Sequence, residues 1–198
     1  MRQLGQATID HARATDGIVA HLLLWVTAKD RATGQPATMG LWTGDDVQDF
    51  VIDGQTRSYF GAGSFIDGDP VTMETGLKVR MHRVRFAPVT AEAAQLVRGY
   101  DTRLAPAELH RALFDPVTMT LIDTPHRLVR GWINSLPIPT PAEGQTAAGE
   151  MIIASSARAL TKSLSRTFSD GSLRARASTD GFFKYTDITG EVETRWGA

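Results

Sequence analysis

Short apolar segments alternate with turn residues along most of the chain, and this pattern favours a fold built from strands. The strongest signal is Asp53-Gly54, in the middle of residues 49–59. An Asp-Gly pair between two strand-like segments is typical of a two-residue β-hairpin. The longest apolar segment, residues 18–26, is interrupted by His21 and is too short to cross a membrane. The sequence therefore predicts a β-rich protein without a membrane span.

The remaining apolar segments predict where the other strands lie. Residues 18–27 are almost continuously apolar, which indicates a strand that is buried on both faces. Residues 75–86 alternate, but the alternation slips by one residue at Met81-His82-Arg83, which predicts a β-bulge. Long, bulged strands are common where a sheet curls into a barrel. Further strands are predicted at residues 39–43, 109–114, 117–122, 128–133 and 149–154, with a hairpin turn at Asp115-Pro116.

Three helices are predicted. Residues 2–14 form a weakly amphipathic N-terminal helix that ends before Asp16-Gly17, and Thr90 caps a short helix that Gly99 ends. The main helix is late in the chain and begins at Ser155 or Ser156. Its predicted buried face consists of Ala157, Leu160, Leu164 and Phe168.

The fold class that follows is mainly β, in the α+β sense, with one domain over residues 1–198. The alternative is two small subdomains that share one interface, with a boundary near residues 100–106.

Local catalytic and metal-binding motifs are absent from the sequence. None of the five histidines has a second histidine or a glutamate at the spacing of a zinc motif, and Gly61-Ala62-Gly63 is not followed by the Gly-Lys-Ser/Thr of a phosphate loop. The aspartates between residues 45 and 69 are expected to lie in solvated turns, since they do not continue into a calcium loop. A site assembled from distant histidines, or a carboxylate pair, is the alternative. We expect no catalytic residue, no bound metal and no cofactor.

Charge singles out one stretch of the chain. The formal net charge of -1 argues against a protein that coats nucleic acid by electrostatics alone. However, Arg158, Lys162 and Arg166 recur every four residues, and form one stripe of the predicted late helix. This stripe is either a solvated helix face or a surface that faces an acidic partner or passing DNA.

Several short motifs occur in a characteristic order. Leu41-Trp42-Thr43-Gly44 is followed by Asp53-Gly54 and by Tyr59-Phe60-Gly61-Ala62-Gly63, and the chain closes on Asp180-Gly181-Phe182-Phe183 and Arg195-Trp196-Gly197. With the strand near 77–86, Gly131-Trp132-Ile133-Asn134 and the helix start at Ser155, this order resembles a group of phage proteins. They are the baseplate hub or tail-tip proteins of long-tailed bacteriophages and of phage-like gene transfer agents.

The resemblance implies a tail-tube-like β-barrel or sandwich and a structural, non-enzymatic role in the virion. The hub would form a homo-oligomeric ring, with a trimer favoured, after synthesis in the bacterial cytoplasm. Its partners would be the distal tail protein, the tape measure protein and the tip fibre or central tail protein, with transient contact to translocating DNA. The chain departs from the family pattern in residues 166–179, which lack an acidic-Gln stretch. Without cysteines, the iron–sulfur region of some hub proteins is not carried over.

Aromatic residues are the candidates for assembly interfaces, because they bury a large area at low entropic cost. The alternative is that they pack only inside the monomer. Two rival functions are kept: the distal tail adaptor, which forms a six-fold ring, and a tail-associated glycan hydrolase. The interface candidates are Trp42, Tyr59, Phe60, Phe182, Phe183, Tyr185 and Trp196.

Overall fold

The computed structural model describes residues 5–14, 17–61, 65, 67–72, 78–87, 90–138, 149–161, 169–185 and 197. The chain divides into two compact units, Met1–Ala159 and Leu160–Ala198. The first unit contains every described strand, and residues 100–106 lie within it. The expectation of a mainly β fold is confirmed.

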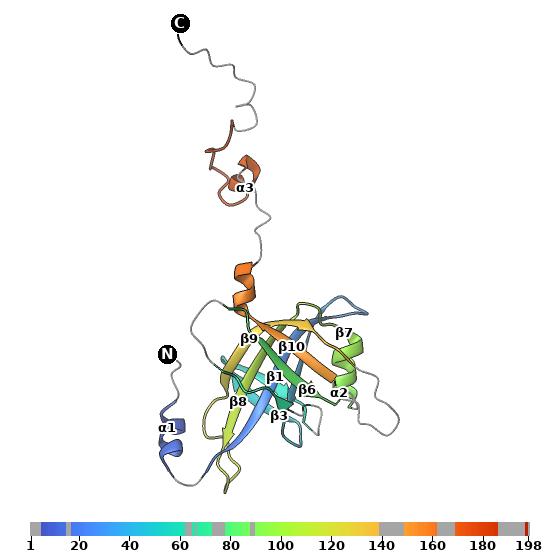
Figure 1. The fold of residues 1–198 in the computed structure, drawn as a ribbon, viewed down its shortest axis with the longest axis vertical. Helices are drawn as coiled ribbons and strands as arrows, with labels where there is room; N and C mark the ends of the chain where they lie inside the picture. Colours follow the sequence, from blue (N-terminus) through green and yellow to red (C-terminus); the bar gives the residue numbers. More distant parts are fainter. Residues whose placement is uncertain are drawn as a thin grey trace. The chain divides into compact units, whose positions relative to one another are not determined.

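The main sheet of the first unit is antiparallel throughout (Figure 1). A short strand, β7 (Tyr100–Asp101), pairs with the end of β1, on the edge opposite β2. In spatial order the other strands are β2 (Pro36–Trp42), β1 (Val19–Asp30), β8 (Pro106–Phe114), β9 (His126–Ser135), β10 (Gly149–Ser155), β6 (Met81–Phe86) and β5 (Asp67–Gly68).

A β-hairpin forms the second layer. Strands β3 (Gln48–Ile52) and β4 (Gln55–Tyr59) are joined by Asp53-Gly54, and Ile52 is opposite Gln55. The φ angles of Asp53 and Gly54 are 51° and 76°, which is the conformation of a type I′ turn. The predicted hairpin is therefore confirmed at its predicted position.

Strand β1 is buried on both faces, as its apolar sequence predicts, because it lies between two cores. Leu24 and Val26 face the larger core, whereas Leu23 packs with Phe50 and Tyr59 of the hairpin in the second core. A strand covered on both sides needs apolar residues on both sides. The continuous apolar run therefore reflects the hairpin layer.

The larger core shows that the main sheet is strongly curled. It contains Met39 and Leu41 of β2 together with Val84 and Phe86 of β6, which lie near opposite ends of the strand order. A helical segment, α2 (Ala91–Ala94) continued by a π-helical turn (Gln95–Gly99), inserts Ala93 and Leu96 into this core. Among the described strands neither sheet closes on itself.

Two of the three predicted helices lie in the first unit near their predicted positions. Helix α1 (Gln6–Arg13) buries Thr8, whose hydroxyl donates a hydrogen bond to Asp123. The predicted cap of α2 is confirmed, since the Thr90 side chain accepts a hydrogen bond from the backbone N–H of Ala93.

The predicted strand at residues 117–122 is wrong, because these residues form the connection between β8 and β9. The Asp115 carboxylate accepts hydrogen bonds from the backbone N–H groups of Val117 and Thr118, both at 2.8 Å. Met119 has a φ of 52°, in the left-handed region. The Asp115 side chain therefore holds a turn where alternation alone suggested a strand.

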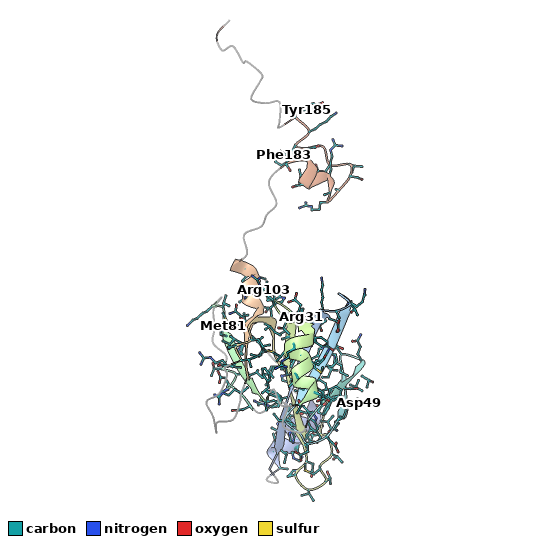
Figure 2. All side chains as sticks on the ribbon, turned by 90° about the vertical axis from the view of Figure 1, so that its right-hand side faces the viewer. Arg31, Asp49, Met81, Arg103, Phe183 and Tyr185 are labelled. Atoms are coloured by element: carbon teal, nitrogen blue, oxygen red, sulfur yellow. The ribbon has the colours of Figure 1, made fainter. Side chains whose placement is uncertain are left out.

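The bulge predicted at residues 81–83 is also wrong. Strand β6 begins only at Met81, which is exposed (Figure 2), and it alternates regularly to the buried Phe86. The pairing instead shifts register between Leu109 and His110 in β8, and between Ile152 and Ile153 in β10. The irregularities that accompany the curl therefore lie on both sides of β9.

The late helix differs from its prediction in the part that the structure describes. Residues Ser156–Thr161 form a 3₁₀ helix, and Leu160, which was predicted to be buried, is exposed. Leu164 and Phe168 lie outside the described residues. The second unit contains a short helix, α3 (Asp170–Arg174), whose N-cap Ser169 accepts a hydrogen bond from the backbone N–H of Ser172.

Candidate functional site

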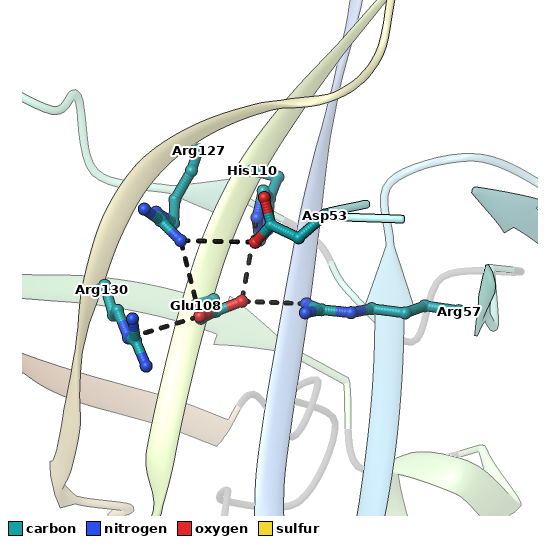
Figure 3. Close-up of polar contacts among 6 residues, drawn as sticks. All are labelled: Asp53, Arg57, Glu108, His110, Arg127 and Arg130. Carbon is teal, nitrogen blue, oxygen red and sulfur yellow. Dashed lines mark hydrogen bonds and ion pairs between the residues drawn. The ribbon is translucent and has the colours of Figure 1, made fainter. Parts of the chain in front are cut away.

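A carboxylate between the two layers of the first unit is the centre of the most polar cluster in the described residues. Glu108 lies on β8, between Ala107 and Leu109, which face the larger core. Its side chain points the other way, toward the hairpin, where Arg57 of β4 donates a hydrogen bond of 2.9 Å to it (Figure 3). The two side chains are only 12% and 14% exposed. The Arg57 guanidinium also lies 5.2 Å from the centre of the Trp25 ring, which adds a cation–π contact.

Two further arginines reach the same carboxylate from β9. The guanidinium of Arg130 lies 3.5 Å from Glu108, and that of Arg127 lies 3.9 Å from Glu108 and 3.6 Å from Asp53 at the hairpin turn (Figure 3). Both arginines are considerably more exposed than Arg57. The cluster thus joins β4, β8, β9 and the hairpin turn, and its cations outnumber its carboxylates.

The deepest member of the cluster is His110, which is 1% exposed. Its Nε2 lies 3.9 Å from Glu108, and neither ring nitrogen has a hydrogen-bond partner among the described residues. Burial lowers the pKa of His110 to about 4, since the charged form loses its hydration. The imidazole is therefore neutral at neutral pH, with one N–H donor and one nitrogen acceptor.

Electrostatics keep the pair at the centre of the cluster charged. Burial alone would raise the pKa of Glu108, but the hydrogen bond and charge of Arg57 outweigh it and lower that pKa. Burial likewise opposes the charge on Arg57, but Glu108 raises its pKa above the ordinary value. Burial raises the pKa of the neighbouring Tyr59 hydroxyl to about 12. None of these groups has a pKa suited to exchanging protons near neutral pH.

A cleft of about 620 Å³ opens beside this cluster. Its walls are the hairpin tip, β8, β9, the segment before β9, and α1. Three arginines and two aspartates line it, together with His110, His126 and apolar side chains such as Ile52 and Leu113. The charged lining residues are Asp53, Arg111, Asp123, Arg127 and Arg130. The cleft therefore offers mostly cationic donors beside an apolar wall.

The motif around Trp42 joins the hairpin to the main sheet. A parallel bridge joins Leu41 to Phe60, and the Trp42 ring N–H donates to the Asp46 carbonyl at 2.6 Å. A Cβ on Gly61 would lie 2.2 Å from the carbonyl oxygen of Gly44, so only glycine allows this approach. We call residues 40–46 and 59–61 the hairpin clamp.

Of the aromatic interface candidates, those in the hairpin clamp pack within the monomer. Trp42 and Tyr59 are buried, and Trp42 contacts His21, Phe50 and Phe114 through its ring. Phe60 is half-buried against the larger core. Trp42 and Tyr59 are therefore part of the second core.

The candidates in the second unit that the structure describes lie on a turn. Tyr185 is exposed (Figure 2) and Phe182 is 83% exposed. Phe183 is half-buried and meets Phe182 edge-to-face, with the ring centres 5.0 Å apart. The Asp180 carboxylate accepts a hydrogen bond from the backbone N–H of Phe182. Trp196 lies outside the described residues.

The proposed basic stripe is described only at its first member. Arg158 donates a hydrogen bond of 2.5 Å to the side chain of Asn134 at the end of β9. Lys162 and Arg166 lie outside the described residues.

Sequence reasoning missed Arg57, Glu108, Arg127 and Arg130 as members of a site, and it treated Asp53 only as a turn residue and His110 only as a strand residue. One signal was available: Glu108 and His110 alternate with Ala107 and Leu109 in a strand that is otherwise strongly apolar. Polar residues on a buried strand face need partners. Which arginines supply them depends on pairing between distant strands, so the sequence alone does not reveal it.

No protein-family model matches the chain, and no curated protein is similar to it at a significant level. Among the described residues, no three histidine, aspartate or glutamate side chains come together as metal ligands. The described helices include none that is long and apolar enough to cross a membrane.

Proposed function

We propose that this protein is a structural component at the distal end of a phage or phage-like tail, where it forms a hub ring. In this role it links the tail tube and distal tail protein to the tip fibre or central tail protein, next to the tape measure protein. It acts by assembly and not by catalysis. It is made in the bacterial cytoplasm and becomes part of the virion.

The observation that carries this proposal is the hairpin clamp. Two of the motifs on which the resemblance rests, Leu41–Gly44 and Tyr59–Gly61, meet in this clamp, and Asp53-Gly54 forms the turn at the other end of the same hairpin. Each motif has an architectural task in holding the hairpin: a bridge, a tight turn or a close backbone approach. Motifs that preserve architecture are what a structural family is expected to share.

The curled sheet supports the proposal at a coarser level. A tail-tube-like barrel needs a strongly curled antiparallel sheet, and the main sheet has that curvature around the larger core. Strand β2 and the two-residue strand β5 end the described strand order. Neighbouring copies in a ring can cover such edges.

The second unit supports assembly through its exposed aromatic residues. Phe182 and Tyr185 are largely exposed, and exposed aromatic groups mark contact surfaces in many proteins. With Trp42 and Tyr59 buried in the first unit, the interface candidates in this proposal are Phe182, Phe183, Tyr185 and Trp196, with Phe60 at the edge of the core. Arg158, Lys162 and Arg166 would face the lumen or an acidic neighbour.

A glycan hydrolase is the less favoured alternative because of the Glu108 environment. Such enzymes need a carboxylic acid with a raised pKa as the proton donor. The pKa of Glu108 is instead lowered by Arg57. A peptidoglycan zymogram with the purified chain tests this alternative directly, and clearing of the gel would contradict the assembly role.

Electron microscopy of purified particles tests the main proposal. We expect density for this chain at the distal end of the tail, in three equivalent copies. Six equivalent copies would identify a distal tail adaptor and reject the hub. Particles without this chain would reject both.

A further inference from the structure

The cleft beside the charge cluster has the features of a binding site that the assembly role does not explain. The buried ring of His110 lies at its inner wall as a hydrogen-bond donor. The exposed guanidinium groups of Arg127 and Arg130 and an apolar wall at Ile52 also line it. Its volume of about 620 Å³ is within the usual range for ligand-binding clefts, which is roughly 300–1,000 Å³. We propose that this cleft binds an acidic peptide segment of a protein partner, with a carboxylate between Arg127 and Arg130 and an apolar side chain against Ile52.

The charge of the cleft favours an anion. Among its lining residues, Arg111, Arg127 and Arg130 outnumber Asp53 and Asp123. Asp123 accepts hydrogen bonds from the Thr8 hydroxyl and the Thr124 backbone N–H, and Asp53 is paired with Arg127. Arg57 already neutralises Glu108 from the hairpin side at 2.9 Å. The contacts of Arg127 and Arg130 with Glu108 are longer, at 3.9 and 3.5 Å, and both side chains are exposed, so a ligand can reach N–H donors of both guanidinium groups beside their contacts with Glu108 and Asp53.

The shape of the donors favours a carboxylate. A guanidinium group presents its N–H donors in a planar fork that matches the two oxygens of a carboxylate. His110 adds one buried donor, and its ring nitrogens have no hydrogen-bond partner in the described part of the chain. A backbone carbonyl of a peptide can accept a hydrogen bond from His110 while a side-chain carboxylate of the same peptide lies on the arginines.

The acidic wall residues argue against nucleic acid as the occupant. A phosphodiester backbone carries a charge at every nucleotide and would pass close to Asp53 and Asp123. A peptide can place a single carboxylate at the arginines and an apolar residue beside Ile52. The exposed Val51 at the hairpin tip extends the apolar wall outward.

The test uses the full chain and a pair of synthetic peptides, acetyl-Ala-Glu-Leu-Glu-Ala-amide and its counterpart with both glutamates replaced by glutamine. Isothermal titration at low salt should give a dissociation constant at least tenfold lower for the glutamate peptide. The double variant R127Q/R130Q should lose at least tenfold in affinity for that peptide. The matched control R83Q/R85Q removes two exposed arginines of β6, each with its own acidic partner, and should bind like the parent.

A second measurement locates the peptide. The ring ¹⁵N signals of His110 should shift on titration, while those of His82, which is buried on β6, should not. Equal binding of the two peptides, or parent-like binding by R127Q/R130Q, would overturn the proposal. So would binding of sodium acetate as tight as that of the peptide, because the ligand would then be a free organic acid, or preferential binding of a single-stranded oligonucleotide. None of these outcomes bears on where the chain lies in a particle.

Discussion

Glu108 is the residue that balances charge between the two layers of the first unit. It receives Arg57 from the hairpin and two more arginines from β9. A carboxylate in this position is stable only because its partners are close, since an unpaired buried charge is costly. Glu108 therefore joins the hairpin to the sheet. It also holds the inner ends of the two exposed arginines that line the cleft.

We predict that Glu108→Gln destabilises the protein by about 2–3 kcal/mol, because it leaves Arg57 nearly buried without a counter-charge. Urea unfolding measures the change. The matched control is Glu150→Gln, which removes the partner of the exposed Arg83 and should change stability by about 0.5 kcal/mol or less. Equal effects of the two variants would show that Glu108 is not the centre of the network.

We predict that the folded protein loses stability in mild acid because of His110. Its pKa is about 4 in the folded protein against 6.5 as the ordinary value, so the unfolded chain binds the proton more readily. The free energy of unfolding should therefore fall as the pH drops from about 6.5 to about 4, by up to about 3 kcal/mol. Unfolding at pH 7, 6 and 5 measures this slope.

His110→Gln should flatten this pH dependence, while His82→Gln serves as the comparison. Burial also lowers the pKa of His82, so that variant should remove a separate part of the slope. Glu108 contributes in the same direction only at lower pH, since its pKa is already below the ordinary range. An unchanged slope in His110→Gln would contradict the prediction.

The hairpin β3–β4 is the element that makes the fold two-layered. It covers the outer face of β1 and β8, contributes Phe50 and Tyr59 to the second core, and carries Arg57 and Asp53 into the charge cluster. Its position is determined at two points, the Asp53-Gly54 turn and the hairpin clamp. Gly54 lies in the turn and Gly61 in the clamp, so substitutions at these two glycines measure the contribution of each point to stability separately.

We predict that Gly61→Ala is more destabilising than Gly54→Ala. At Gly54 a Cβ meets no atom within 4 Å, so the cost comes from its φ of 76° and should be about 1 kcal/mol. At Gly61 the new Cβ would meet the Gly44 carbonyl at 2.2 Å, so the hairpin must move and the cost should exceed about 2 kcal/mol. Thermal unfolding of the two variants compares them, and the reverse order would show that the clamp is loose.

Sequence patterns correctly predicted those elements whose structure depends on residues close to them in the sequence. The Asp53-Gly54 hairpin and the Thr90 cap follow from local chemistry, and the double burial of β1 can be read from its own apolar sequence. The prediction failed at residues 117–122, where the Asp115 side chain competes with strand pairing. It also misplaced the bulges, because these depend on how β8, β9 and β10 pair across the sheet. The charge cluster was missed for the same reason.

The division into two units is the feature that matters for the whole molecule. The first unit holds both cores, and the second has no buried residue in its one described helix, α3. Stability should thus come from the first unit. The exposed aromatic turn at residues 182–185 is then available for contacts with other chains.

We predict that truncation after Asp180 leaves the thermal unfolding midpoint unchanged but abolishes incorporation into particles. The removed residues that the structure describes, 181–185 and 197, belong to neither core, and in the proposed hub the removed segment supplies the docking aromatics. Circular dichroism measures folding, and immunoblotting of purified particles measures incorporation. The double variant Phe182→Ser/Tyr185→Ser is a milder version of the same test. Normal incorporation of both chains would show that residues 181–198 are dispensable for assembly.

The double burial of β1 also has a consequence for how the chain folds during synthesis. Its register places Val19 opposite Phe114 and Val26 opposite Ala107, so the partner strand leaves the ribosome long after β1 does. Until then, the most apolar strand of the protein has only β2 and the hairpin to cover it. Pairing between such distant segments slows folding. The nascent chain therefore presents an unfinished, apolar sheet edge until β8 has been made, and such an edge is the kind of surface that chaperones recognise.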